Sequence, residues 1–453
     1  MIARNYGKLA LMEAFNMKVG FISLGCSKNL VDTEMMIGLF KNNNYEIVAN
    51  PEDAEIIIVN TCGFIESAKR EAIDTLLEMA DYKEQNCKLL VATGCMVQRY
   101  KEELKKELPE VDLFVSIDEY DKLYELINIK IGESNESSRE DKRFTLSPLD
   151  RVITTNGYYA YLKIAEGCSN NCTYCAIPKI RGPYVSRPYE EIIKEAQNLS
   201  DKGLQEIIVI AQDTTKYGLD LYGKYRLPEL LKDLCKMNFT WVRFLYAYPE
   251  SVTDELIETV KNEPKICHYF DMPIQHINDR VLKRMARKTN GEEIKNKIDK
   301  IKKEIPDVVL RTSLIAGFPG ETEDEFNELK EFVKEAKFDR LGCFAYSKED
   351  GTPAEKLDGH LPEEIKEKRA NEIMEIQSKI SLENNQKFIG KQMKVLVENI
   401  TDDGKYYVSR SYREVPEDTD GVIYIENTQD LIIGDFYHVT ITDALEYDLV
   451  ANV

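Results

Sequence analysis

The feature that most constrains the fold of this chain is the repeated alternation of short apolar runs with helical or polar segments. Three such runs follow one another near the N-terminus: VGFISLG, EIIIVN and KLLVATG. Six more occur between about residues 154 and 385: YYAYLKI, EIIVIA, VRFLYA, HYFDMPI, VVLRTSLIAG and LGCFAY. Strands that alternate with helices of this length predict parallel βα units. We therefore expect an α/β chain, with a doubly wound sheet over residues 17–131 and a partial, open (β/α)6 barrel over residues 154–385.

Two further segments complete the expected domain organisation. The polar, turn-forming stretch GESNESSREDKR cannot bury enough apolar surface to join a core, so we expect residues 132–153 to form a linker. A helix from about Leu361 should close the barrel. After it, residues 387–453 contain β-rich pieces separated by Asp-Gly and Gly-Asp turn signals: MKVLVENI, KYYVSRSY, GVIYI and FYHVTITDA. These pieces predict a small all-β domain.

Composition is that of a globular protein of a reducing compartment. No run approaches the ~18 apolar residues of a membrane helix, and residues 1–16 lack the apolar stretch of a secretory signal. The ten cysteines therefore indicate thiols that act as ligands or core residues, and we expect a cytoplasmic protein. The formal net charge of -20 opposes binding to a phosphate backbone. A basic protein is the better-matched partner.

Three cysteines close together in sequence are the first candidate site: Cys168, Cys172 and Cys175. A four-iron cluster normally takes four thiolates, so three would leave one iron free to bind a small molecule. The C-x3-C-x2-C spacing resembles the radical S-adenosylmethionine (radical SAM) signature, and the triplet follows the first expected barrel strand, where barrel active sites lie. The alternatives are a disulfide or a zinc site, whose fourth ligand would come from Cys267, His268 or His276.

A second set of thiols lies at the ends of the three N-terminal runs. Cys26, Cys62 and Cys95 stand in SLGC, VNTC and ATGC. Because the carboxyl ends of parallel strands meet at one edge of a sheet, three thiols far apart in sequence can converge there and hold another incomplete cluster. The alternative is that strand-end cysteines are small buried hydrophobes. Core packing is the predicted role of the other four cysteines, at positions 87, 235, 267 and 343.

Several longer motifs carry a family resemblance. They are SLGCSKNLVDTE, VNTCGFIESA, CSNNCTYC, IRGPYVSRPYEEI, DMPIQH, AGFPGET and SYREVPEDTDG. From about Met17 to the C-terminus the chain resembles the ribosomal protein methylthiotransferases. The resemblance implies a cysteine-bearing N-terminal domain, a radical SAM barrel and a C-terminal β-barrel of the type called TRAM. This order agrees with the one inferred from the strand and helix pattern.

The resemblance also implies cofactors and a reaction. Cys168, Cys172 and Cys175 would hold the 4Fe-4S cluster that binds and splits S-adenosylmethionine, and Cys26, Cys62 and Cys95 would hold a second 4Fe-4S cluster. The family places a methylthio group on the β-carbon of an aspartate in the twelfth protein of the small ribosomal subunit. An electron donor is needed, and no catalytic residue beyond the cluster ligands is expected. Tyr174 would stand against the adenine of the cofactor, with ordinary packing as the alternative.

Two other functions are weighed against this one. A methylthiotransferase acting on adenosine in transfer RNA would share the clusters, but its β-barrel should be basic. From Lys387 onward six Lys or Arg stand against thirteen Asp or Glu, and CSKN and DMPIQH replace the CQMN and PVQSGS-like stretches expected of that branch. We therefore expect no direct binding to nucleic acid. A non-catalytic cluster carrier is the other alternative, and it would not cleave S-adenosylmethionine.

Overall fold

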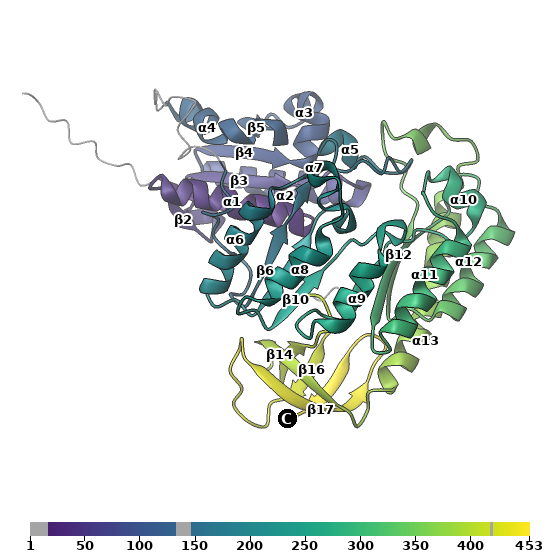
Figure 1. Cartoon of the computed structure of the whole chain (residues 1–453). Helices are drawn as coiled ribbons and strands as arrows, with labels where there is room; N and C mark the ends of the chain where they lie inside the picture. The colour runs from purple at the N-terminus through teal and green to yellow at the C-terminus, as the bar shows by residue number, and fades with distance from the viewer. Residues whose placement is uncertain (1–16, 133–145, 417–419) are drawn as a thin grey trace, which may run out of the picture. The chain divides into compact units, whose positions relative to one another are not determined.

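The structure is a computed structural model of the chain, and it describes residues 17–132, 146–416 and 420–453 (Figure 1). It forms two compact units, Met1–Val152 and Ile153–Val453. In the described ranges no helix is both long and apolar enough to cross a membrane. Most of the polar stretch expected to be a linker falls within residues 133–145 and lies outside the described residues.

The first unit is built on a five-stranded parallel sheet. Its strands are β1 (Lys18–Ser23), β2 (Glu46–Val48), β3 (Ile56–Thr61), β4 (Leu89–Gly94) and β5 (Leu113–Val115), in the order β2-β1-β3-β4-β5. This is the strand order of a doubly wound fold whose switch point lies between β1 and β3. The expected sheet is confirmed. The sequence pattern missed β2 and β5 because each has only three residues.

Helices cover both faces of this sheet. They are α1 (Ser27–Asn42), α2 (Glu66–Asp81), α3 (Cys95–Glu107) and α4 (Leu123–Ile131). Ile57 and Val59 of β3 pack with residues of α2 and α3, whereas Ile56 and Ile58 pack with residues of α1 and α4. A strand buried on both faces needs a continuous apolar run, which is why EIIIVN stands out in the sequence.

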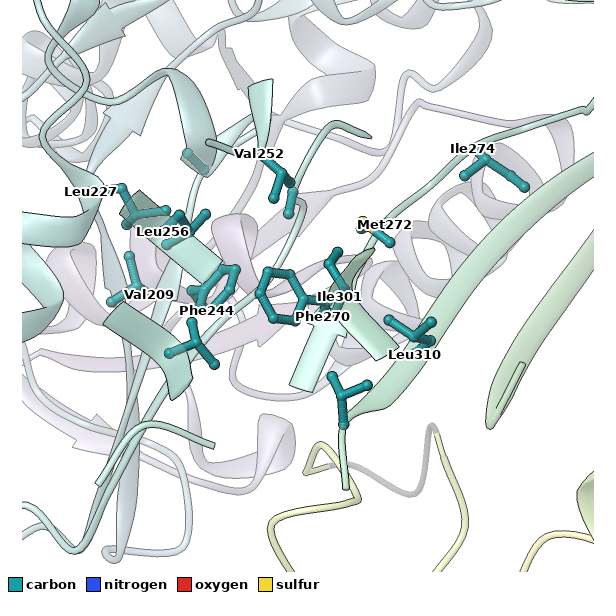
Figure 2. Close-up of a cluster of buried hydrophobic side chains, with 14 of the residues drawn as sticks. Val209, Leu227, Phe244, Val252, Leu256, Phe270, Met272, Ile274, Ile301 and Leu310 are labelled. Atoms are coloured by element: carbon teal, nitrogen blue, oxygen red, sulfur yellow. The ribbon is translucent and has the colours of Figure 1, made fainter. Parts of the chain in front are cut away.

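The second unit contains a partial barrel of six parallel strands. They are β6 (Tyr159–Lys163), β9 (Glu206–Ile210), β10 (Trp241–Phe244), β11 (Tyr269–Asp271), β12 (Val309–Ala316) and β13 (Arg340–Ala345). They form two three-stranded sheets, β10-β9-β6 and β11-β12-β13, joined by a parallel bridge between Val242 and Ile266. Inside, Phe244 of β10 packs edge to face with Phe270 of β11, their centroids 5.2 Å apart (Figure 2). The expected (β/α)6 architecture is confirmed.

Helices follow the barrel strands. The longer ones are α6 (Tyr189–Asp201), α8 (Leu227–Cys235), α9 (Asp254–Asn262), α11 (Gly291–Glu304), α12 (Glu323–Ala336) and α13 (Glu363–Gln386), and the short ones are α5 (Ile177–Ile180), α7 (Leu219–Tyr222) and α10 (Asp279–Arg284). Sequence marks their starts: Thr322 and Glu325 form a capping box at α12, as Asn290 and Glu293 do at α11. The expected closing helix is α13.

A closed five-stranded barrel forms the C-terminal part of the second unit. Its strands are β14 (Gln392–Ile400), β15 (Tyr406–Arg410), β16 (Ile423–Glu426), β17 (Phe436–Ala444) and β18 (Leu449–Asn452), in the order β14-β15-β16-β18-β17. The all-β expectation is confirmed. The last strand, LVAN, was missed because it has only four residues.

This small barrel docks on the amino-terminal ends of the partial barrel's strands. Arg410 of β15 pairs with Glu206, the first residue of β9. Tyr269, the first residue of β11, donates a hydrogen bond to Asp420 at 2.5 Å, and Trp241, the first residue of β10, packs edge to face on Phe436. The carboxyl ends of the same strands, where a barrel carries its active site, are therefore at the opposite end.

Candidate metal centres

The central triplet occupies a tightly turned loop after β6 and the two-residue strand β7 (Ala165–Glu166). The Cys168 N–H donates to Gly182 O at 3.1 Å, and the Cys175 N–H donates to Cys172 O at 3.1 Å. Gly167 has a φ of +68°, and a Cβ placed on it would lie 2.1 Å from Pro183 O. Only glycine fits this position, so the backbone itself gathers the three thiols.

The same loop is fastened to the far side of the barrel through Thr173. Its N–H donates to Met285 O at 3.0 Å and its hydroxyl to Arg284 O at 2.8 Å, both at the end of α10. Thr173 O in turn accepts from the Ala354 N–H at 2.9 Å. The first barrel strand's loop is thus fixed by residues more than a hundred positions away in the sequence.

A second support comes from the loop after β9. Asn170 donates through Nδ2 to Asp213 Oδ2 at 3.0 Å, and Lys216 donates to Asn170 Oδ1. Asp213 is fully buried. This network holds the backbone between Cys168 and Cys172 in place, and sequence reasoning did not single out any of its three residues.

The thiols of the triplet lie in surroundings that disfavour free thiolate charge. Burial raises the pKa of Cys168, and a negative charge on Cys172 adds to that rise. Burial also raises the pKa of Tyr174 well above its usual range, again with a contribution from Cys172. Three thiolates so close together repel one another unless a metal centre holds them. Tyr174 packs against a buried cluster that includes Met285 and Phe318, so the packing alternative for it is supported.

The residues fit a cluster better than a single zinc ion. Across the described ranges no three His, Cys, Asp or Glu side chains converge at single-ion distances. Cys267 and His268 precede β11 and lie at the barrel end opposite the triplet. His276 accepts a hydrogen bond from the Asn278 N–H at 3.0 Å and stands 3.5 Å from Glu321. A four-iron cluster is larger than an ion, so three thiolates set further apart suit it without a fourth protein ligand.

The N-terminal thiols stand at the ends of three adjacent strands. Cys26 is the N-cap of α1 after β1, Cys62 directly follows β3, and Cys95 directly follows β4 and begins α3. Because β1, β3 and β4 are neighbours in the parallel sheet, all three cysteines lie on its carboxyl edge. Cys62 and Cys95 are buried, whereas Cys26 is exposed.

Contacts between the three loops show how closely they approach. A Cβ on Gly25 would lie 2.8 Å from the Cys62 Sγ, so the loop with Cys26 lies directly against Cys62. Asn29 donates through Nδ2 to Thr61 O at 3.1 Å, and its Oδ1 lies 3.5 Å from the Cys95 Sγ. The structure therefore brings the second predicted set of thiols together at one edge.

The four remaining cysteines are placed as packing residues. Burial raises the pKa of Cys235, Cys267 and Cys343 to about 12, and it also raises the pKa of Cys87. Cys87 belongs to a core cluster of the first unit, and Cys235 and Cys343 pack against the core of the second. Their buried, apolar surroundings suit the predicted packing role.

Three family models match the chain. Uncharacterized protein family UPF0004 matches residues 18–116, the radical SAM superfamily matches residues 162–333, and the TRAM domain matches residues 389–453. The first two ranges each contain one complete set of three candidate thiols. Neither thiol set therefore depends on residues outside its own matched range.

Similar full-length proteins have been curated. Ribosomal protein uS12 methylthiotransferase RimO of Alkaliphilus oremlandii is 58% identical over 440 residues, which cover 96% of this chain and 99% of that protein. The protein of the same name from Clostridioides difficile is 52% identical over 441 residues, with 96% and 99% covered. This chain belongs to the ribosomal protein uS12 methylthiotransferase family. S-adenosylmethionine and two 4Fe-4S clusters are the cofactors of such radical SAM methylthiotransferases, as the resemblance implied.

Solved structures agree on the fold of this family member. The radical S-adenosylmethionine methyltransferase TsrM of Kitasatospora setae, with tryptophan substrate and a cofactor analogue bound, superposes with a TM-score of 0.55 at 11% identity, covering 75% of each chain. The same enzyme with cobalamin and a [4Fe-4S] cluster bound gives a TM-score of 0.54 at 12% identity, covering 75% of this chain and 77% of that one. At these identities the likeness concerns the fold alone.

Proposed function

We propose that this chain is a radical SAM methylthiotransferase that adds a methylthio group to the β-carbon of an aspartate in ribosomal protein uS12. The observation that carries the proposal is the placement of two separate sets of three cysteines, one at the carboxyl edge of the N-terminal parallel sheet and one in the loop that follows the first barrel strand. Membership in the uS12 family supports the choice of substrate. Since the target carbon is unactivated, side-chain acids and bases cannot break its C–H bond, and a radical cofactor is needed.

We assign the ligands as the sequence predicted them. Cys168, Cys172 and Cys175 would hold the cluster that binds S-adenosylmethionine, and Cys26, Cys62 and Cys95 would hold the second cluster. When bound, these groups supply a 5'-deoxyadenosyl radical for hydrogen abstraction, a sulfur atom for insertion and a methyl group.

The protein's own residues hold the triplet loop in place and keep water out of the barrel. Gly167 and Thr173 fix the loop that carries the triplet, and Asn170 with Asp213 supports it from the next strand. Buried apolar side chains fill the interior of the partial barrel and exclude water from it (Figure 2). We also retain residues 17–131, 132–153, 154–385 and 387–453 as the proposed domain organisation.

The partner we propose is a basic protein, as a small-subunit ribosomal protein would be. Arg410 and Arg413, two of the six basic residues after residue 386, are buried in ion pairs with Glu206 and Asp339. Glu414 and Asp420 are buried as well, so the buried charges balance and the module keeps the net acidic character of its composition. The net acidic module supports attraction to a basic substrate, which we propose the protein meets in the cytoplasm.

The decisive experiment is mass spectrometry of uS12 after anaerobic incubation with the reconstituted protein, S-adenosylmethionine and a one-electron reductant. The expected product carries one methylthio group on a single aspartate. The Cys172→Ala variant should form neither that product nor 5'-deoxyadenosine, while Cys235→Ala, a buried thiol outside both sites, should behave as the parent does. A methylthio group on transfer RNA instead would establish the alternative substrate, and absence of 5'-deoxyadenosine from the parent would leave only a cluster carrier.

A further inference from the structure

Arg287 carries a buried guanidinium and follows the segment to which the triplet loop is hydrogen-bonded. It follows α10, and Ala286 before it has a φ of +55°, a conformation that costs energy for a residue with a Cβ. The Arg287 guanidinium lies over the Tyr248 ring, 4.5 Å from its centroid, and Nη2 donates to Pro273 O at 3.1 Å. The exposed fraction of the Arg287 side chain is 0%. The backbone thus accepts strain where it places a charge in the interior.

That charge is only partly compensated by the protein. Within the described part of the chain, Arg287 Nε and Nη1 have no hydrogen-bond acceptor. Glu250 Oε2 stands 3.7 Å from Arg287 Nη2, beyond hydrogen-bond distance, and it has no donor there either. A buried cation with unpaired donors is strongly unfavourable unless a further negative group is bound beside it.

The thiol triplet lies in a loop that is hydrogen-bonded to the segment just before Arg287. Met285 and Arg284, two and three residues before Arg287, accept both hydrogen bonds from Thr173, which lies between Cys172 and Cys175. Burial alone would lower the pKa of Arg287, but the pKa is raised overall, and Cys172 is among the groups that raise it. The electrostatic interaction between the guanidinium and the Cys172 sulfur is therefore weakly screened, because little water lies around them.

We infer that Arg287 sets the reduction potential of the central cluster, by stabilising the reduced form more than the oxidised form. The inference rests on the proposed function for the identity of that cluster. Reduction adds one electron from a one-electron donor, so the cluster becomes more negative by one charge while no bond forms or breaks. A fixed cation beside a ligating sulfur favours the more negative form, because net charge and nearby donors govern cluster potentials. Arg287 acts through the cluster and is a positioning residue.

Glu250 opposes the effect of Arg287. Its carboxylate lies 3.7 Å from Arg287 Nη2 and offsets part of the field of the guanidinium. The pair therefore offers two substitutions with opposite expected signs. Arg287→Gln should make the cluster harder to reduce, Arg287→Lys should restore most of the parent behaviour, and Glu250→Gln should make the cluster easier to reduce.

The experiment is a redox titration of the reconstituted full-length protein, followed by electron paramagnetic resonance without S-adenosylmethionine. The signal of the central cluster is first identified as the one that changes when S-adenosylmethionine is added to a separate sample. At a fixed potential the ratio of reduced to oxidised cluster should fall about tenfold in Arg287→Gln, which is a midpoint shift of about 59 mV for one electron. In Glu250→Gln the midpoint should rise.

Two results would overturn the inference. Unchanged midpoints in Arg287→Gln and Glu250→Gln, with weaker binding of S-adenosylmethionine by calorimetry, would make the guanidinium a cofactor contact instead. If Arg287→Gln fails to hold its cluster, Glu250→Gln decides alone, and a midpoint equal to or below that of the parent refutes the inference. Because the titration needs no uS12, it can succeed even where the proposed substrate proves wrong.

Discussion

Single residues in the triplet loop carry constraints that neighbouring residues do not. Gly167 and Gly182 both have left-handed φ angles, +68° and +73°, in the same loop. A Cβ would strike Pro183 O in the first case and meet nothing within 4 Å in the second. Conformation alone therefore does not explain the need for glycine at position 167, and close backbone approach does.

Gly167→Ala is expected to disrupt the central cluster. The new Cβ would force the loop away from Pro183 and move Cys168, so the iron bound at the central site should fall to a small fraction of the parent value. Gly182→Ala is the matched control, which costs only the left-handed conformation, about 1–2 kcal/mol. Iron and sulfide analysis with electron paramagnetic resonance measures both. Equal iron content in the two variants would contradict the steric argument.

The N-terminal thiols should separate cofactor cleavage from sulfur insertion. A variant with alanine at positions 26, 62 and 95 keeps the whole central loop, so 5'-deoxyadenosine should still form at a rate near that of the parent. No methylthio product should appear, because the second cluster has no ligands. Chromatography of the nucleoside and mass spectrometry of uS12 measure the two outcomes, and any methylthio product would exclude these cysteines from the reaction.

At the scale of elements, helix starts and strand lengths explain what the sequence shows and what it hides. The capping box of α12 and the continuous apolar runs of β3 and β4 are visible directly. Strands β2, β5 and β18 are too short to give a period, and tertiary pairing alone defines them. The thiol sets could be predicted because each cysteine follows a recognisable strand. Arg287 could not, because only folding brings it beside a loop more than a hundred residues earlier.

The start of α12 should weaken in acid. The hydrogen bond from Arg280 lowers the pKa of Glu325 to about 2, against an ordinary value of 4.5. A depressed pKa means that the stabilisation is fully present above pH 4.5 and is lost as pH falls toward 2. Glu325→Gln keeps the cap but removes the charge. At neutral pH the amide protons at the start of α12 should therefore exchange faster, because the free energy of local opening falls by up to about 1 kcal/mol. Hydrogen exchange should show this gap closing in acid, and a constant gap would contradict the assignment.

At the scale of the second unit, the C-terminal barrel is part of the catalytic domain's structure. Glu206 is shared by Arg243 and Arg410, and all three side chains are almost fully buried. Removing the module from Met393 onward would leave Glu206 and Arg243 uncovered. A truncation therefore cannot test substrate binding separately from folding, and point substitutions on the exposed face are needed.

Arg410→Met should destabilise the protein by about 3–5 kcal/mol, because it leaves a buried carboxylate with half of its compensation. Lys405→Met is the control, since Lys405 and its partner Asp403 are both exposed and such pairs contribute little to stability. Thermal unfolding of the reconstituted proteins measures the difference. Equal melting temperatures would show that the buried network does not contribute to stability.

Neutralising exposed carboxylates of the C-terminal module should weaken binding of uS12 without slowing formation of 5'-deoxyadenosine. We suggest Glu426→Gln, Asp430→Asn and Asp435→Asn together, since all three are exposed. Glu71→Gln, Asp74→Asn and Glu78→Gln on α2 are the matched control. Fluorescence anisotropy with labelled uS12 at two salt concentrations measures affinity. An equal loss in both variants would reduce the effect to overall charge.

The partial barrel has two ends, and the C-terminal barrel covers the amino-terminal one. Reactants must therefore enter and leave by the remaining rim, where the triplet loop lies. Because both reactants use the same end, the one that binds second covers the one that binds first. S-adenosylmethionine should therefore bind before the ribosomal protein, and its products should leave after it. Steady-state inhibition patterns should accordingly be those of an ordered mechanism rather than of random binding.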